Sequence, residues 1–219
     1  TSLETRGYDT CIFSVPAYST LGWFEDPVTG PMVRLGDYEL IQTVLHELVH
    51  ATVFVPENVD FNESFATFFS QEALLQFETH LPVATHFEER LEASRKFDQN
   101  LSRFREEVMG LYRENRSPLD RERERNELEE KFRKSLVGSS LSTEGIRDLR
   151  LNDACLALAK TYSSDFARFS SILSKLKGDL RVLLQLAVEA EDFEEPLKHM
   201  ETLAKAEGHT RNFSDENVF

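Results

Sequence analysis

The stretch "LHELVHATVFVPENVDFNESFATFF", residues 45–69, decides the fold of this chain. It opens with two histidines four positions apart, His46 and His50, and Glu47 directly follows the first of them. On a helix, side chains four positions apart lie on one face, about 5–6 Å from each other. The two imidazoles can therefore reach one common point if this stretch is helical.

The sequence around this stretch predicts two helices joined by a short loop. The first helix starts at Asp37, which is a good N-cap after Gly36, and ends before Pro56, because proline disfavours helix in the preceding residue. A second helix follows over residues 61–81 and stops near Pro82. The apolar stripe of the first helix is Leu40, Val44, Leu45 and Leu48.

Two histidines with an adjacent glutamate form a pattern that suits zinc-dependent hydrolysis. Imidazole nitrogens bind Zn²⁺ at about 2.0–2.1 Å. Glu47 is one residue on from His46, so it points to the flank of the ligand face and reaches a water on the metal without being a ligand. Zinc lowers the pKa of such a water towards ~7, and a carboxylate can take its proton. The motif predicts a zinc site with Glu47 as general base.

A third protein ligand is needed, and Glu63 is the candidate. Twelve residues lie between His50 and Glu63, enough for the end of one helix, a turn and the start of the next. Asp60 and Glu63 also have the spacing of a capping box, so Glu63 could instead serve the start of its helix. The other histidines are expected on the surface: His80, His86, His199 and His209.

The rest of the chain is predicted to be mainly helical. Residues 8–35 are rich in Gly, Pro, Thr and aromatics and read as short strands and turns. Residues 86–136 form a charged helical hairpin with its turn at Ser117-Pro118; a solvated hairpin is favoured over a partner-binding coiled coil. A loop over 137–145 precedes a helical stretch over 146–176, and two further helices follow.

The expected fold is mostly α with a small β portion (α+β), built as a zincin-like metal helix pair plus the long charged hairpin. Three parts are expected: residues 1–84 with the strand and turn segment and the metal helices, residues 85–137 with the hairpin, and residues 138–219 with helices packing on the metal region. The alternative is a helical interaction protein whose metal site is structural or inactive, with the hairpin as its working part.

Composition limits the partners. The 219 residues carry a net charge of −14, so nucleic acid, which needs clustered Lys and Arg, is not an expected partner. The two cysteines, Cys11 and Cys155, allow one disulfide or none. Nothing in the sequence indicates an oligomeric state.

Three blocks of sequence resemble a known family. They are "GYDTCIFSVPAYSTLGWFEDPV" (7–28), "LHELVHATVFVPENVDFNESFATFF" (45–69) and "LRLNDACLALAKTYSSDFARF" (149–169). Together they resemble the bacterial putative aminopeptidase family of gluzincin-type zinc peptidases. The resemblance implies a peptide substrate, zinc bound by His46, His50 and Glu63, and Glu47 as general base and acid.

The resemblance carries further expectations about the whole protein. Family members usually have a further N-terminal portion, and this chain is expected to begin after it. Members are often exported or lipid-anchored. Many gluzincins place an acid four residues after the ligand glutamate to orient a histidine, whereas this chain has Thr67 there, so that role is vacant or moved.

Two candidates for substrate contact complete the site. Tyr162, in the third block, is the candidate donor to the oxyanion of the tetrahedral intermediate; its alternative is a tyrosine packed between helices. Residues 19–23 are predicted to be an edge strand that pairs with the substrate backbone, with Leu21, Gly22 and Trp23 as contacts. Gly22 lets another backbone approach closely, and Trp23 offers an apolar wall. The alternative is a structural strand packed on the core.

Overall fold

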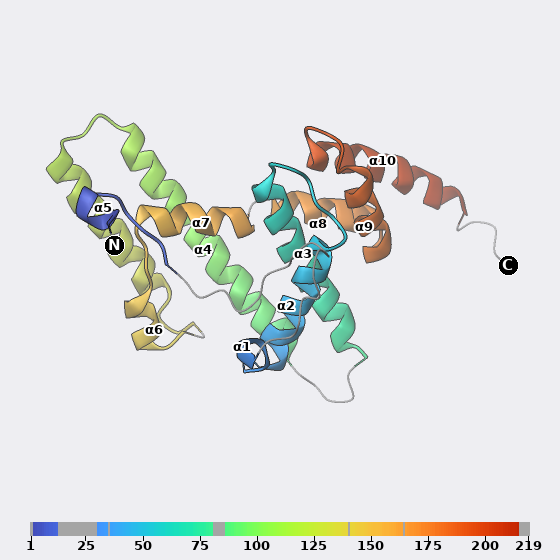
Figure 1. Ribbon diagram of the computed structural model, residues 1–219, viewed down its shortest axis with the longest axis horizontal. Coiled ribbons are helices and arrows are strands. Elements are labelled where there is room, and N and C mark those ends of the chain that lie inside the picture. Colours follow the sequence, from blue (N-terminus) through green and yellow to red (C-terminus); the bar gives the residue numbers. More distant parts are fainter. Residues whose placement is uncertain are drawn as a thin grey trace. The chain divides into compact units, whose positions relative to one another are not determined.

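The computed structural model describes residues 2–12, 30–34, 36–80, 86–139, 141–163 and 165–214, and within these ranges all regular structure is helical (Figure 1). The chain divides into two compact units. The first comprises residues 1–13 and 86–160, and the second residues 14–85 and 161–219. A mostly helical fold is confirmed, and each unit has its own hydrophobic core.

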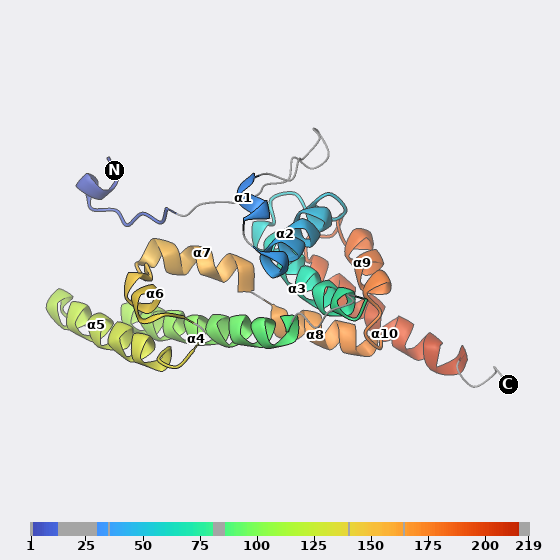
Figure 2. The ribbon, with the colours of Figure 1, turned by 90° about the horizontal axis from the view of Figure 1, so that it is seen from below.

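The second unit holds the two helices predicted around the histidine motif. Its helices are α1 (Gly30–Val33), α2 (Asp37–His50), α3 (Val59–Glu78), α8 (Phe166–Lys175), α9 (Leu180–Glu189) and α10 (Pro196–Ser214). Helix α3 packs against α2 and also contacts α8 and α9 (Figure 2). Helix α3 is therefore the central helix of the unit. The contacts that hold α3 in the core also determine which of its side chains point towards α2.

Aromatic side chains hold α3 in place. Phe65 is fully buried, and its ring meets that of Phe169 on α8 edge-on at 5.4 Å between centroids. Phe61 stacks on Phe65 at 5.7 Å, and Phe68 stacks on Phe169 at 5.5 Å. Aromatic pairs at these separations add to the stabilisation from burying their large apolar area. The start of α3, which precedes Glu63, is thus anchored in the core.

The starts of α2 and α3 differ from prediction. Gly36, not Asp37, occupies the N-cap of α2, with a φ of 94° that glycine adopts without steric cost. Helix α3 begins at Val59 and is capped by Asn58, whose side chain accepts a hydrogen bond from the Phe61 N–H at 3.2 Å. The cap of α3 is therefore supplied by Asn58, which leaves Glu63 available for another role.

The first unit contains the charged hairpin. Its helices are α4 (Phe87–Arg113), α5 (Pro118–Ser135), α6 (Thr143–Asp148) and most of α7 (Asp153–Ser163), with a 3₁₀ turn, η1, at Glu4–Arg6. Ser117 caps α5 by accepting from the Asp120 N–H, and Pro118 takes the first helical position. The rings of Phe104 on α4 and Phe132 on α5 stack at 4.9 Å inside the hairpin.

The helix predicted over residues 146–176 is broken into three. Residues 149–152 leave the helix, and arginines of α5 bind two of their carbonyls: Arg133 donates to Leu149 O at 2.9 Å, and Arg125 donates to Leu151 O. A second break falls before α8, where Asp165 has a left-handed φ of 61°. Neither break has a proline or glycine to signal it, so the pattern of apolar residues alone could not predict them.

The N-terminal segment is fastened to the start of α7. A disulfide joins Cys11 to Cys155, with 4.9 Å between their Cα atoms. Asn152 donates to the Thr10 carbonyl at 2.9 Å, and the Asp153 N–H donates to the Asp9 carboxylate at 3.1 Å. The alternatives left open for the two cysteines are thereby resolved in favour of a bridge within the first unit.

The expected β portion is not found in the described residues. Residues 8–12 form no strand, and Gly30–Val33 are helical rather than strand or turn, because Pro31 near a helix start loses no internal hydrogen bond. Residues 13–29, and with them the predicted edge strand containing Leu21, Gly22 and Trp23, lie outside the described residues. The division at residues 84 and 137 stays a prediction.

Candidate metal centre

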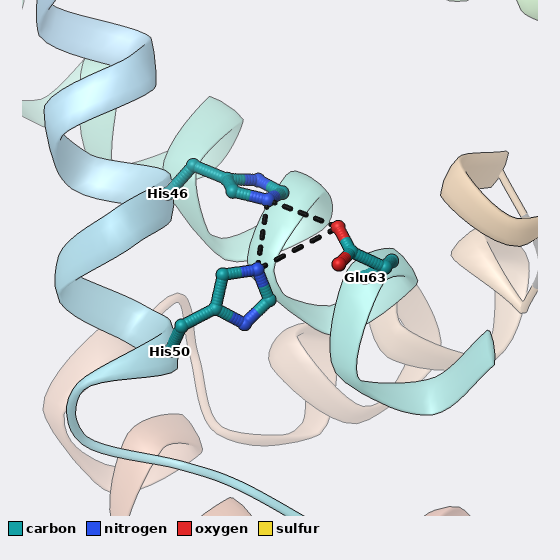
Figure 3. A group of neighbouring side chains, drawn as sticks. All are labelled: His46, His50 and Glu63. Carbon is teal, nitrogen blue, oxygen red and sulfur yellow. Dashed lines mark hydrogen bonds and ion pairs between the residues drawn. The ribbon is translucent and has the colours of Figure 1, made fainter. Parts of the chain in front are cut away.

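Three side chains from two helices converge on one point (Figure 3). His46 and His50 project from the same face of α2, and Glu63 reaches towards them from the first turns of α3. His46 Nε2 lies 3.0 Å from His50 Nε2 and 3.2 Å from Glu63 Oε2, and His50 Nε2 lies 3.5 Å from the same oxygen. The convergence predicted from the spacing of the motif is therefore present.

The position of these side chains follows from how α2 is buried. Val49 is in the core, whereas Leu48 is 57% exposed, so one face of the helix turns inward and another turns to solvent. Leu48 therefore does not belong to the buried face, contrary to the apolar stripe predicted from the sequence. The histidine side chains lie beside the buried face and are 17% and 11% exposed for His46 and His50 respectively. Such partial burial shields the ligand atoms from most of the solvent.

The size of the triangle fits a tetrahedral metal ion. Zinc with bonds of about 2.0–2.1 Å in tetrahedral geometry places each pair of ligand atoms about 3.3 Å apart. The three separations here, 3.0, 3.2 and 3.5 Å, bracket that value. Two imidazole nitrogens and a carboxylate oxygen are also the donor set that catalytic zinc sites use, with a fourth position left for water or substrate.

No choice of histidine tautomers makes all three contacts of the triangle hydrogen bonds at the same time. A neutral imidazole carries one N–H, so each Nε2 can donate along only one side of the triangle. If both histidines donate to Glu63, two Nε2 atoms that each carry a hydrogen lie only 3.0 Å apart. If one histidine instead donates to the other, it no longer donates to the carboxylate. A cation at the common point satisfies all three atoms at once.

Glu63 has the electrostatics of a ligand carboxylate. Burial alone would raise the pKa of Glu63. Hydrogen bonds from His46 and His50, together with the positive charge of these histidines when protonated, lower the pKa by a larger amount, so it falls to about 2. The carboxylate is thus ionised at neutral pH. An ionised carboxylate beside two imidazoles attracts a divalent cation.

The remaining predicted residues fall in different places. Glu47 is half-buried on α2, between the two histidines in sequence. The backbone of Tyr162 belongs to α7, while its side chain lies outside the described part of the structure. Thr67 is half-buried one turn beyond Glu63, and its carbonyl accepts from the Ser70 hydroxyl at 3.0 Å. No carboxylate therefore stands at that position.

The other histidines whose side chains the structure describes are not part of this centre. His80 is exposed at the end of α3, near the Gln76 carbonyl, and His86 is exposed at the start of α4. His199 is half-buried rather than on the surface, because its ring stacks on Phe193 at 3.5 Å. The side chain of His209 lies outside the described residues.

One residue that the sequence reasoning missed stands beside Glu63. Asn62 is buried, and its amide forms hydrogen bonds with both the N–H and the C=O of Val55 in the loop between α2 and α3. The sequence signal was a polar residue between apolar Phe61 and the ligand glutamate. Its partner in the loop could not be deduced without the three-dimensional structure.

Comparison with known proteins yields one family. The family model described as "Putative aminopeptidase" matches residues 1–203, which is nearly the whole chain. No curated protein and no solved structure matches the chain significantly. The match includes α2 and α3, the hairpin and the helix that carries Tyr162.

Proposed function

Because the chain belongs to the putative aminopeptidase family, we propose that it is a zinc-dependent peptidase of the gluzincin type, whose metal is held by His46, His50 and Glu63. The observation that carries this proposal is the convergence of three ligand atoms within 3.0–3.5 Å of one another. Their chemistry and spacing suit zinc. Within the described residues, no other group of histidine, cysteine or acidic side chains is arranged to hold a metal ion.

Glu47 is proposed as the general base and acid. Zinc in this site would polarise the scissile carbonyl and acidify a water molecule. Glu47 lies next to His46 in sequence and is not one of the three converging side chains. In the proposed mechanism its carboxylate would accept a proton from the attacking water. The same group would return that proton to the amine that leaves.

The substrate contacts are proposed from sequence. Tyr162 would donate a hydrogen bond to the oxyanion, and residues 19–23, including Leu21, Gly22 and Trp23, would pair with the substrate backbone. Backbone pairing suits a peptidase that accepts varied side chains. Release of single residues from the amino end is the mode of cleavage that the family description suggests. Among the described helices, none is long and apolar enough to cross a membrane, and export or lipid anchoring stays a proposal.

A peptide-library digest tests the proposal. The wild-type protein is compared with Glu47→Gln and with a control, Glu88→Gln, which changes an exposed glutamate on α4 in the same way. Each is assayed as purified, after removal of metal by a chelator, and after zinc is restored. We expect hydrolysis by the wild type and Glu88→Gln, loss with chelator, and recovery with zinc.

Glu47→Gln separates the metal site from the chemistry. Glutamine has the shape of glutamate but cannot accept the proton, so this variant should retain zinc, measured by mass spectrometry, and lose turnover. Near-normal turnover in Glu47→Gln would overturn the general-base role. A protein that holds zinc but cleaves no peptide would favour the alternative of a structural site in an interaction protein.

A further inference from the structure

We propose that Asn62 is a positioning residue for the metal centre: it ties the α2–α3 loop to α3 and so sets the distance between the histidine ligands and Glu63. The inference rests on the proposed zinc site. It concerns how the protein holds its own ligands at the spacing that the ion requires, a role that falls to a residue which does not itself bind the metal.

The side chain of Asn62 connects α3 to the preceding loop through two hydrogen bonds. Its Oδ1 accepts from the Val55 N–H at 2.9 Å, and its Nδ2 donates to the Val55 carbonyl at 2.8 Å. The residue is only 8% exposed, so these two bonds form away from water, where an unpaired amide is costly. Both polar atoms of the Asn62 side chain are thus hydrogen-bonded to the main chain of a single loop residue, Val55.

The loop that Asn62 binds connects the helix of the two histidine ligands to the helix of Glu63. It covers residues 51–58, beginning immediately after His50 and ending at the Asn58 cap of α3. Val53 and Val55 are buried in the core of the second unit. A second tether acts from outside, where the Phe54 N–H donates to the Glu191 carboxylate at 2.8 Å. The loop is therefore fixed from both sides.

Asn62 acts at the ligand end of this arrangement because it adjoins Glu63. Phe61, on its other side, is held in the aromatic cluster with Phe65 and Phe169. Phe61 packs the first turn of α3 into the core, and Asn62 binds the same turn to the loop. These contacts restrict rotation of the turn about the helix axis. A rotation or shift of this turn would carry the Glu63 oxygen away from its positions 3.2 and 3.5 Å from the histidine nitrogens.

The test compares zinc affinity with fold stability in three variants. Asn62→Ala removes both hydrogen bonds. Asn62→Asp keeps the shape and the acceptor but loses the donor to Val55 C=O, and provides a second reading should the alanine variant not fold. Leu183→Ala, which cuts a fully buried side chain of α9 in the same core, is the control for destabilisation without change at the loop.

The zinc Kd is measured by competition with a chelator, and the urea midpoint of the metal-free protein is measured separately. All titrations are made where every variant is folded, because binding and folding free energies are linked. The visible absorption of the Co²⁺-loaded proteins reports the geometry around the ion.

We expect both Asn62 variants to bind zinc about 10–100-fold more weakly than the wild type, the usual cost of removing a residue that orients ligands. Their Co²⁺ spectra should change. Leu183→Ala should lower the urea midpoint but leave the zinc Kd and the Co²⁺ spectrum as in the wild type. Wild-type zinc affinity and spectra in the Asn62 variants would overturn this inference alone. Absence of zinc binding by the wild type would overturn the proposed metal site and this inference with it.

Discussion

The disulfide between Cys11 and Cys155 leads to a quantitative prediction about stability. The bridge closes a loop between residues 144 apart in sequence. In the chain-entropy model, closing a loop of that length lowers the entropy of the unfolded state enough to stabilise the fold by about 5 kcal/mol. We therefore expect the double variant Cys11→Ser, Cys155→Ser to lose much of that free energy of unfolding.

The two-unit architecture changes this value only slightly. Residues 14–85 belong to the second unit and lie within the loop. If that unit stays folded while the first unfolds, the flexible part of the loop is roughly halved, and the logarithmic dependence on length lowers the stabilisation by about 0.6 kcal/mol. A measured loss of about 2–5 kcal/mol is the expected range, since disulfides often deliver less than the entropic value.

The assay is urea unfolding followed by far-ultraviolet circular dichroism. The wild type is measured with and without reductant, and the double serine variant serves as the control that reductant should not affect. Reduction of the wild type should reproduce the stability of the variant. A loss below about 1 kcal/mol in both cases would refute the reasoning, because the two hydrogen bonds of the N-terminal segment, worth about 1 kcal/mol each, would then suffice to hold it.

Three further predictions concern the core, the pH dependence of stability and the chemistry. Phe65→Ala should cost about 3–5 kcal/mol of unfolding free energy, read from urea midpoints, because Phe65 is fully buried beside α8; a loss below about 1 kcal/mol would contradict the packing. Burial raises the pKa of Asp98 from 3.8 to about 6, so the folded state binds its proton more tightly, and stability should fall by up to about 3 kcal/mol as pH rises from about 4 to 6. Asp98→Asn should flatten that part of the stability profile, and an unchanged profile would show that Asp98 is not its source. Tyr162→Phe should lower kcat about 10²–10³-fold with the circular dichroism spectrum unchanged, whereas an unaltered rate would return Tyr162 to a packing role.

The ligand set could be predicted from the sequence because local geometry determines most of it. Helical spacing places His46 and His50 on one face, and the short connection brings Glu63 within reach. The choice between ligand and cap for Glu63 could not be settled in the same way. It depended on which residue caps α3, and both Asn58 and Asp60 have side chains that can do so.

The features that escaped prediction depend on contacts distant in sequence. Arg125 and Arg133 reach from α5 to the carbonyls that interrupt the helix before α7. The bond from Asn62 to Val55 joins a helix to a loop through a side chain, and no periodic pattern signals it. Sequence periodicity reports which face of an element is buried, but it does not report which distant polar group a main-chain carbonyl will meet.

Diffraction from crystals loaded with zinc, collected on both sides of the zinc absorption edge, tests the central claim most directly. The proposal predicts one anomalous peak about 2.0–2.2 Å from His46 Nε2, His50 Nε2 and a carboxylate oxygen of Glu63. Glu47 should lie close to the fourth position without binding the ion. A peak elsewhere, or a zinc ion bound by the histidines with Glu63 turned away, would contradict the proposed metal centre.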